Sequence, residues 1–224
     1  MLKKILGMLF ESANKDISKS SNPEEISHAS DIREPKYEEN IVLVLDVSGS
    51  METADYPPNR LRAAKIASSE FIKEKIKINH SAKVGIVAFS DFGRVVNDIV
   101  FAKDNLILLQ NSLDRLKIKG GTDIAIGLKY AFDLLLKNAM PGALNRIILL
   151  TDGHGGHPIR VSEVIKSMGI VIQIIGIGGC PNDVNERLLK KIASFAGGKI
   201  QYRFIGDKDS LVEHFRSLAT NITK

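Results

Sequence analysis

The sequence contains a single cysteine, Cys180, among its 224 residues. One thiol cannot form a disulfide within the chain, so the sequence does not describe a disulfide-stapled secreted domain, and we expect a reducing, cytoplasmic location. No apolar run approaches the roughly 18 residues that a membrane-spanning helix needs. With only 7 prolines and 18 glycines, the chain is neither collagenous nor of low complexity.

Motifs of several enzyme classes are also missing from the sequence. It has no GxSxG nucleophile elbow, no GxxxxGK phosphate loop and no HExxH zinc motif. The segment GIGGCPND at 176–183 lacks the full glycine pattern of a dinucleotide-binding loop. No His or Asn is arranged around Cys180, which we interpret as a bystander thiol. These absences favour a binding protein over an enzyme.

The charge balance is mildly positive. Lys and Arg number 31 against 26 Asp and Glu, which gives a net charge of +5. The basic residues are scattered through predicted helices, a pattern typical of solvated helix faces rather than of a nucleic-acid site. We therefore expect no nucleic-acid partner, whereas a weak positive field favours acidic partners.

The first 40 residues differ from the rest of the chain. Residues 1–12 place Leu2, Ile5, Leu6, Leu9 and Phe10 at helical spacing, and Glu11 ends this stretch too early for a signal peptide. We interpret it as a short amphipathic segment that packs locally or frays, with docking on a membrane surface as the alternative. Residues 13–40 read as a polar linker. The sequence thus predicts an N-terminal segment and linker over 1–40 and one domain over 41–224.

From residue 41 onward, short β-branched runs alternate with helical periods. Strands are predicted at 41–46, 83–90, 94–100, 145–151, 170–177 and 199–204. Apolar residues spaced for helices lie between them, including Val184, Leu188, Ile192 and Phe195 on one face, and Ser210 with Glu213 form a candidate capping box in front of the last helix. Continuous apolar strands separated by helices indicate parallel strands buried on both faces.

One pair of strands breaks this alternation. Only a few residues separate 83–90 from 94–100, too few for a crossover, so this pair is predicted to be an antiparallel hairpin. The fold class is therefore α/β, a three-layer, doubly wound, mostly parallel six-stranded sheet with helices on both faces. In such sheets ligands bind beyond the carboxyl ends of the strands.

That rule brings three polar segments together. The first strand ends in Asp46 and is followed by Ser48 and Ser50, the fourth ends at Thr151 and Asp152, and Thr122 precedes a helix. Hydroxyl and carboxylate oxygens are the hard ligands that Mg²⁺ prefers. Ser48, Ser50 and Thr122 would hold the ion without neutralising it, and Asp46 and Asp152 would supply negative charge directly or through water. Such a site leaves one position of the metal open.

The motifs DVSGS at 46–50, GGTD around Thr122 and TDG at 151–153 resemble the metal-ion-dependent adhesion site of the von Willebrand factor type A (vWA) domain family. The resemblance covers about residues 41–220. It implies the strand order 3-2-1-4-5-6, with strand 3 antiparallel. It also implies that Ser48, Ser50 and Thr122 contact the metal, with Asp46 and Asp152 mostly behind them, and that an Asp or Glu of a partner protein completes the coordination.

We therefore expect a non-enzymatic module that binds a protein partner through a divalent cation, Mg²⁺ or else Mn²⁺ or Ca²⁺. Two alternatives stay open at this point. A Mg²⁺-dependent hydrolase or phosphotransferase would use Asp46 as nucleophile, but Ser48 stands where a second carboxylate would be needed. A self-assembling scaffold subunit would place its acidic segment at 34–39 on a neighbouring copy, and the sequence leaves the oligomeric state undetermined.

Several residues near the three motifs are candidates for specificity. The segment 51–60, with Glu52, Asp55, Tyr56 and Arg60, is predicted to be a rim loop. His154 and His157 are interpreted as part of a flexible, glycine-rich rim rather than as Mg²⁺ ligands, because Mg²⁺ prefers oxygen. Asp123 is a candidate cap of the helix that follows it.

Overall fold

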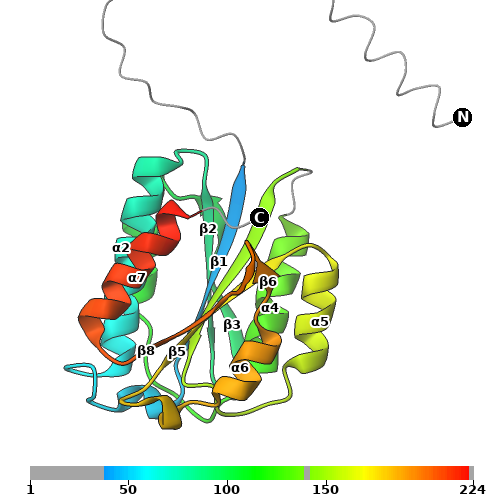
Figure 1. Cartoon of the computed structure of the whole chain (residues 1–224). Helices are drawn as coiled ribbons and strands as arrows, with labels where there is room; N and C mark the ends of the chain where they lie inside the picture. The colour runs from blue at the N-terminus through cyan, green and yellow to red at the C-terminus, as the bar shows by residue number, and fades with distance from the viewer. Residues whose placement is uncertain (1–37, 139–141, 222–224) are drawn as a thin grey trace, which may run out of the picture. The chain divides into compact units, whose positions relative to one another are not determined.

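The computed structural model describes residues 38–138 and 142–221. A six-stranded sheet runs through the middle of the domain, in the order β3-β2-β1-β4-β5-β8 (Figure 1). Within this sheet all strand pairs are parallel except β2 with β3, which confirms the predicted hairpin and the predicted order. The strands are β1 (Glu39–Asp46), β2 (Lys83–Phe89), β3 (Gly93–Phe101), β4 (Leu144–Thr151), β5 (Val171–Ile177) and β8 (Tyr202–Ile205).

Strand β1 lies at the centre of the sheet and is buried along its whole length. Its register places Leu43 beside Ile86 of β2 and Ile148 of β4. Successive side chains point to opposite faces, so Leu43 and its alternate neighbours pack in one core and Val42 and Val44 in another. An uninterrupted apolar run is therefore the sequence signature of this doubly covered strand.

Helices cover both faces of the sheet, as predicted (Figure 1). One core contains residues of α2 (Arg60–Ile78), α3 (Leu106–Asp114) and α7 (Lys208–Thr220). The other contains residues of α4 (Ile124–Lys137), α5 (Ile159–Ser167) and α6 (Glu186–Ile192). Two short 3₁₀ helices, η1 (Gly49–Glu52) and η2 (Pro181–Asp183), follow β1 and β5. The result is the three-layer α/β fold that the alternating pattern predicts.

The segment between α6 and α7 differs from the prediction. Helix α6 ends at Ile192, and Phe195, predicted on its apolar face, lies instead in β6 (Phe195–Ala196) with its side chain exposed. β6 pairs with β7 (Lys199–Ile200) in a separate two-stranded sheet. The predicted strand 199–204 is therefore split between two sheets, because the chain leaves the β6–β7 hairpin before it joins β5.

The last helix begins earlier than predicted. Asp207, not Ser210, caps α7, and its carboxylate accepts a hydrogen bond from the Ser210 backbone amide at 2.8 Å. The predicted capping box of Ser210 and Glu213 is wrong, since both residues lie inside the helix. By contrast, the predicted cap of α4 is confirmed: Asp123 Oδ1 accepts from the amides of Ala125 and Ile126 at 2.9 and 3.4 Å.

By their internal contacts, the residues that the structure describes belong to one compact unit. Within the part that the structure describes, no helix has the length and apolarity needed to cross a bilayer. The amphipathic segment predicted at 1–12 and most of the linker lie outside the described residues. The boundary at residue 40 stays a prediction.

Candidate functional site

The site is built at the carboxyl end of the central strand. Asp46, the last residue of β1, is fully buried, and both of its carboxylate oxygens accept hydrogen bonds. Oδ1 accepts from the Ser48 backbone amide at 2.9 Å, and Oδ2 accepts from the Thr151 hydroxyl at 2.6 Å. These bonds fix the carboxylate between the ends of β1 and β4.

Burial raises the pKa of Asp46 to about 6, although the hydrogen bonds from Ser48 and Thr151 oppose this rise. The nearby charge of Asp152 adds to the increase. Asp152 is itself almost fully buried, so two acidic groups lie close together with little solvent around them. Such a pair gives the pocket a negative potential that a bound cation would relieve.

Two hydroxyls stand directly in front of Asp46. Ser48 is buried at the start of η1, Ser50 is exposed, and their Oγ atoms lie 3.2 Å apart. Because η1 turns immediately after β1, side chains two residues apart come to the same side. The pair offers two neutral oxygens, one of them facing solvent.

The loop before α4 is bonded to the loop after β1. The Lys119 amide donates to Val47 O at 2.7 Å, and the Gly49 amide donates to Gly120 O at 3.0 Å. These bonds bring half-buried Thr122 to the same edge of the sheet as the two serines. A third bond, from the Asp123 amide to Ser90 O at 2.7 Å, anchors the loop to the end of β2.

The loop after β4 closes against Thr122. Gly155 has a φ of +104°, and a Cβ placed there would lie 2.0 Å from Thr122 O. Only glycine permits this close approach. Thr122 therefore lies between the loop of Ser48 and Ser50 on one side and the loop that follows Asp152 on the other.

Arg60 has a role at the site that the sequence did not reveal. It is the first residue of α2 rather than part of a rim loop, and it is almost fully buried. Its Nη1 lies 3.5 Å from Asp152 Oδ2, and its Nη2 lies 2.5 Å from Asp55 Oδ2. Hydrogen bonds to Asp55 raise the pKa of the guanidinium. Arg60 thus places a buried positive charge beside the carboxylate of Asp152.

Tyr56 also departs from the predicted rim loop. It is completely buried, and its hydroxyl donates toward the carbonyl oxygens of Gly178, at 3.3 Å, and Ile205. Burial raises its pKa to about 12. This residue fastens the loop after β1 to the ends of β5 and β8. Sequence periodicity could not predict this contact, because Tyr56 lies in an irregular segment, between an acidic turn and two prolines.

The remaining candidates lie at the rim. His154 and His157 are exposed, as expected of a loop, and His154 Nε2 lies 2.9 Å from Asp183 O. Cys180 is an exposed free thiol whose Sγ lies 3.4 Å from Asp183 Oδ1. Neither histidine nor the thiol contacts the serines or Asp46 through any hydrogen bond of the described residues.

The donor set fits a hard divalent cation. Within residues 38–138 and 142–221, no three His, Cys, Asp or Glu side chains gather as a metal-binding group. The hydroxyl groups of serine and threonine are the further oxygen ligands available at this edge of the sheet. Ser48, Ser50 and Thr122 offer neutral oxygens, while the carboxylates of Asp46 and Asp152 are buried behind them, a division of roles that suits Mg²⁺ with its retained waters.

A sequence profile described as the von Willebrand factor type A domain matches residues 41–154, about half of the chain. This stretch contains all five candidate residues. The chain belongs to the von Willebrand factor type A domain family.

Curated relatives of this vWA domain are diverse. Calcium-activated chloride channel regulator 1 of Bos taurus is 29% identical over 171 residues, which is 75% of this chain and 17% of that protein. A UPF0353 protein of Mycolicibacterium paratuberculosis is 27% identical over 197 residues, covering 75% of this chain and 56% of the relative. The chain thus spans only part of the length of these relatives.

Solved structures give the same fold. A von Willebrand factor type A structure from Catenulispora acidiphila has a TM-score of 0.67 and 28% identity, covering 82% of this chain and 42% of that one. The conserved hypothetical protein BatB from Bacteroides thetaiotaomicron has a TM-score of 0.68 and 21% identity, covering 80% and 96% of the two chains. vWA domains commonly serve as protein-interaction modules. This chain is a vWA domain by sequence and by fold.

Proposed function

We propose that this vWA domain binds a protein partner through a divalent cation, Mg²⁺ or else Mn²⁺ or Ca²⁺. Ser48, Ser50 and Thr122 hold the ion, Asp46 and Asp152 balance its charge from behind, and an Asp or Glu of the partner takes the open position. The observation that carries the proposal is the hydroxyl pair of Ser48 and Ser50, 3.2 Å apart, in front of the buried carboxylate of Asp46. Neutral ligands leave the ion electron-poor, which favours a carboxylate from outside.

A basic groove beside the site supports an acidic partner. A cavity of about 480 Å³ begins at Val47, one residue from Ser48. Its wall contains no acid and four cations, which are Arg94, Arg115, Lys117 and Lys119. None of these four forms an ion pair with another described residue. Exposed Phe92 stands at its edge. An acidic segment with an apolar residue, one carboxylate of which reaches the metal, matches this surface.

The first test is metal binding itself. Protein stripped with EDTA is titrated with Mn²⁺ and Mg²⁺ in a calorimeter. Asp46→Asn keeps the shape of the side chain but removes its charge, and we expect metal affinity to fall by about 10–100-fold. Thr122→Ala removes a direct ligand and should weaken binding at least as much. Thr220→Ala deletes the same hydroxyl at the exposed end of α7 and should leave affinity unchanged.

The second test is partner binding. Proteins captured in Mg²⁺ but not in EDTA, and not by the Asp46→Asn domain, are the expected partners, and replacing one of their Asp or Glu residues should abolish binding. Equal capture in Mg²⁺ and EDTA would contradict the proposal. Turnover of generic phosphate esters that depends on Mg²⁺ and on Asp46 would instead favour a hydrolase.

A further inference from the structure

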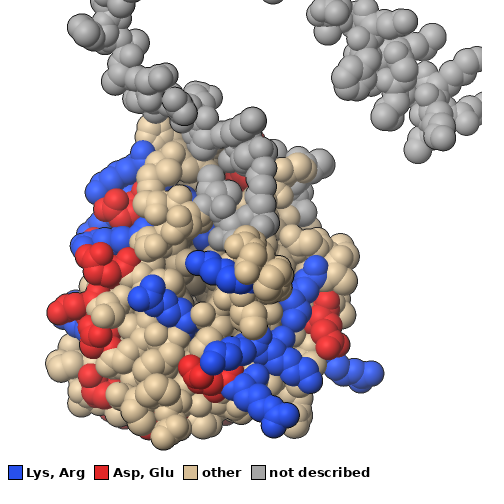
Figure 2. Space-filling view, viewed as in Figure 1, with Lys and Arg blue, Asp and Glu red and all other residues tan. Residues whose placement is uncertain are grey.

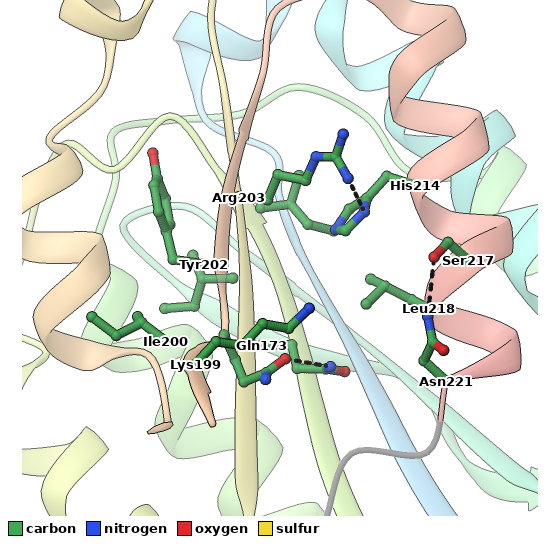
Figure 3. Close-up of a pocket in the computed structure, with 12 residues that line it drawn as sticks. Gln173, Lys199, Ile200, Tyr202, Arg203, His214, Ser217, Leu218 and Asn221 are labelled. Carbon is green, nitrogen blue, oxygen red and sulfur yellow. Dashed lines mark hydrogen bonds between the residues drawn. The ribbon is translucent and has the colours of Figure 1, made fainter. Parts of the chain in front are cut away.

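A second groove, which shares no lining residue with the motifs discussed so far, lies between the edge strand β8 and the C-terminal helix α7 (Figure 3). Its volume is about 260 Å³. It is lined by side chains of β5, the β6–β7 hairpin, β8 and α7, and no Asp or Glu is among them.

Two cations on the strand side of this groove are unneutralised. Lys199 and Arg203 are exposed, and neither forms an ion pair with any residue that the structure describes. Arg203 and His214 reach toward each other across the gap between β8 and α7, with Nη1 and Nδ1 3.4 Å apart (Figure 3). Burial together with Arg203 and Lys199 lowers the pKa of His214 to about 4, so the ring is neutral and can accept from Arg203 at neutral pH.

The floor of the groove adds further positive charge. Gln173 Oε1 accepts from Arg146 Nε at 3.1 Å and Nη2 at 2.5 Å, and Arg146 also donates to Leu218 O at 3.2 Å. Behind it, the carboxylate of Glu39 is shared between Arg146 and Lys75. Two buried cations around one buried acid leave an excess positive charge beneath the groove.

Polar groups surround the cations. Gln173 Nε2 donates to Gln201 Oε1 at 3.1 Å, and Asn221 Nδ2 donates to Ser217 Oγ at 3.1 Å on the opposite wall (Figure 3). Amides and a hydroxyl at these positions offer hydrogen bonds to the uncharged part of a ligand. The groove is thus a cationic cleft with a polar rim.

We propose that the groove between β8 and α7 binds a dianionic phosphate group, held by Arg203 and Lys199. The arginine fork matches two phosphate oxygens and the lysine ammonium supplies a point charge. Two cations that form no ion pair with a described residue, above a positively charged floor, favour a dianion over a single carboxylate. This site is independent of the proposed metal site.

Two sources could present such a group: a soluble phosphate ester or the headgroup of an anionic lipid. Lys and Arg gather over the same face of the domain near α6, which itself contains Arg187, Lys190 and Lys191 (Figure 2). Next to the groove, the β6–β7 hairpin exposes Phe195 at 74% and Ile200 at 48%. An exposed aromatic residue among cations suits a lipid surface, whereas a groove with polar groups on both walls suits a soluble ester.

The test measures binding in EDTA, which keeps any divalent ion out of the experiment. Inorganic phosphate and glycerol phosphate are titrated by calorimetry, and vesicles of phosphatidylcholine with and without phosphatidic acid are used for co-sedimentation. We expect at least one phosphate probe to bind wild-type protein, and Arg203→Ala to weaken it about tenfold. Lys199→Ala/Arg203→Ala should abolish binding.

Lys103→Ala/Lys137→Ala is the matched control, because it removes two exposed cations elsewhere on the domain and should leave affinity unchanged. Thermal melts of all variants verify the fold. Loss of a soluble probe in the double variant supports a soluble ester. Loss of binding confined to phosphatidic acid vesicles supports a lipid headgroup. Absence of binding by every probe, or equal binding by the double variant and wild type, would overturn the proposal.

Discussion

The carboxylate of Glu39 lies buried between two cations at the start of the central strand. Oε2 accepts from Lys75 Nζ at 2.8 Å, and Oε1 pairs with Arg146. Burial disfavours the charged form, but Arg146 and Lys75 together hold the pKa of Glu39 below its ordinary value. The three residues come from β1, α2 and β4, so one acid joins three elements.

Replacing Glu39 with Gln should leave both buried cations without their counter-charge. Removing one partner of a buried ion pair costs about 3–5 kcal/mol of unfolding free energy, which urea denaturation measures. Glu213→Gln is the matched control, because Glu213 pairs with Arg216 on the exposed face of α7, and such pairs contribute about 0–1 kcal/mol. Equal effects of the two substitutions would show that the buried acid has no special role.

At the scale of elements, α4 packs against β2 through a glycine. A Cβ on Gly127 would lie 2.7 Å from ring atoms of Phe89, well inside van der Waals contact. The helix therefore approaches the sheet closely at this point, and its preceding loop carries Thr122 toward the serines. A glycine that is poor for the helix itself serves the packing of the helix on the sheet.

Gly127→Ala should destabilise the domain despite the better helix propensity of alanine. Propensity alone favours Ala by roughly 1 kcal/mol, but overpacking costs about 1–3 kcal/mol, so we expect a lower midpoint in thermal unfolding. Gly206→Ala is the comparison, because its nearest neighbour would be 3.5 Å away. A higher midpoint for Gly127→Ala would mean that Phe89 moves aside without cost.

Periodicity was sufficient to predict the elements that run through the sheet and its covering helices. β1, β2, β3, β4 and β5 have continuous or β-branched runs, and the structure bounds them within about two residues of the predictions. Periodicity failed where local geometry determines the structure. A helical pattern placed Phe195 in α6, and the strand predicted at 199–204 is split between two sheets. Two residues each are too few for β6 and β7 to leave a pattern.

At the candidate site, too, some features could be predicted from the sequence and others could not. The sequence predicts Asp46, Ser48, Ser50 and Asp152 from their positions at strand ends and Thr122 from its place in the loop before a helix. Hydrogen bonds between the loops bring these segments to one edge. Metal binding by them stays a prediction. The pairing of Arg60 with Asp152 could not be predicted, because it joins residues 92 positions apart that share no motif.

At the scale of the whole molecule, we expect the titration of His214 to make the unfolding free energy depend on pH. Its pKa is lowered from 6.5 to about 4 by burial, Arg203 and Lys199, so the unfolded chain takes up a proton at a higher pH than the folded one. The contribution of His214 to stability is therefore complete above pH 6.5 and is lost progressively toward pH 4. Asp46 opposes this effect, because its pKa is raised to about 6 and its protonation favours the folded state as the pH falls. In urea denaturation across this range, the unfolding free energy of wild type should therefore fall more steeply toward pH 4 than that of His214→Asn.

His214→Asn should reduce that slope, because the titrating group is gone, whereas His80→Asn removes an exposed histidine and should leave the slope unchanged. A slope identical in wild type and His214→Asn would assign the acid sensitivity to other groups.

Strand β1 connects two opposite electrical environments. Its first residue, Glu39, is outnumbered by buried cations, while its last, Asp46, lies beside a second buried acid. Eight residues of extended chain separate these ends by roughly 23 Å, and mobile salt screens charge over about 8 Å at physiological ionic strength. The two buried charge clusters therefore act independently, and the charge of each cluster, rather than the net charge of +5, sets the field inside the protein at that end of the strand.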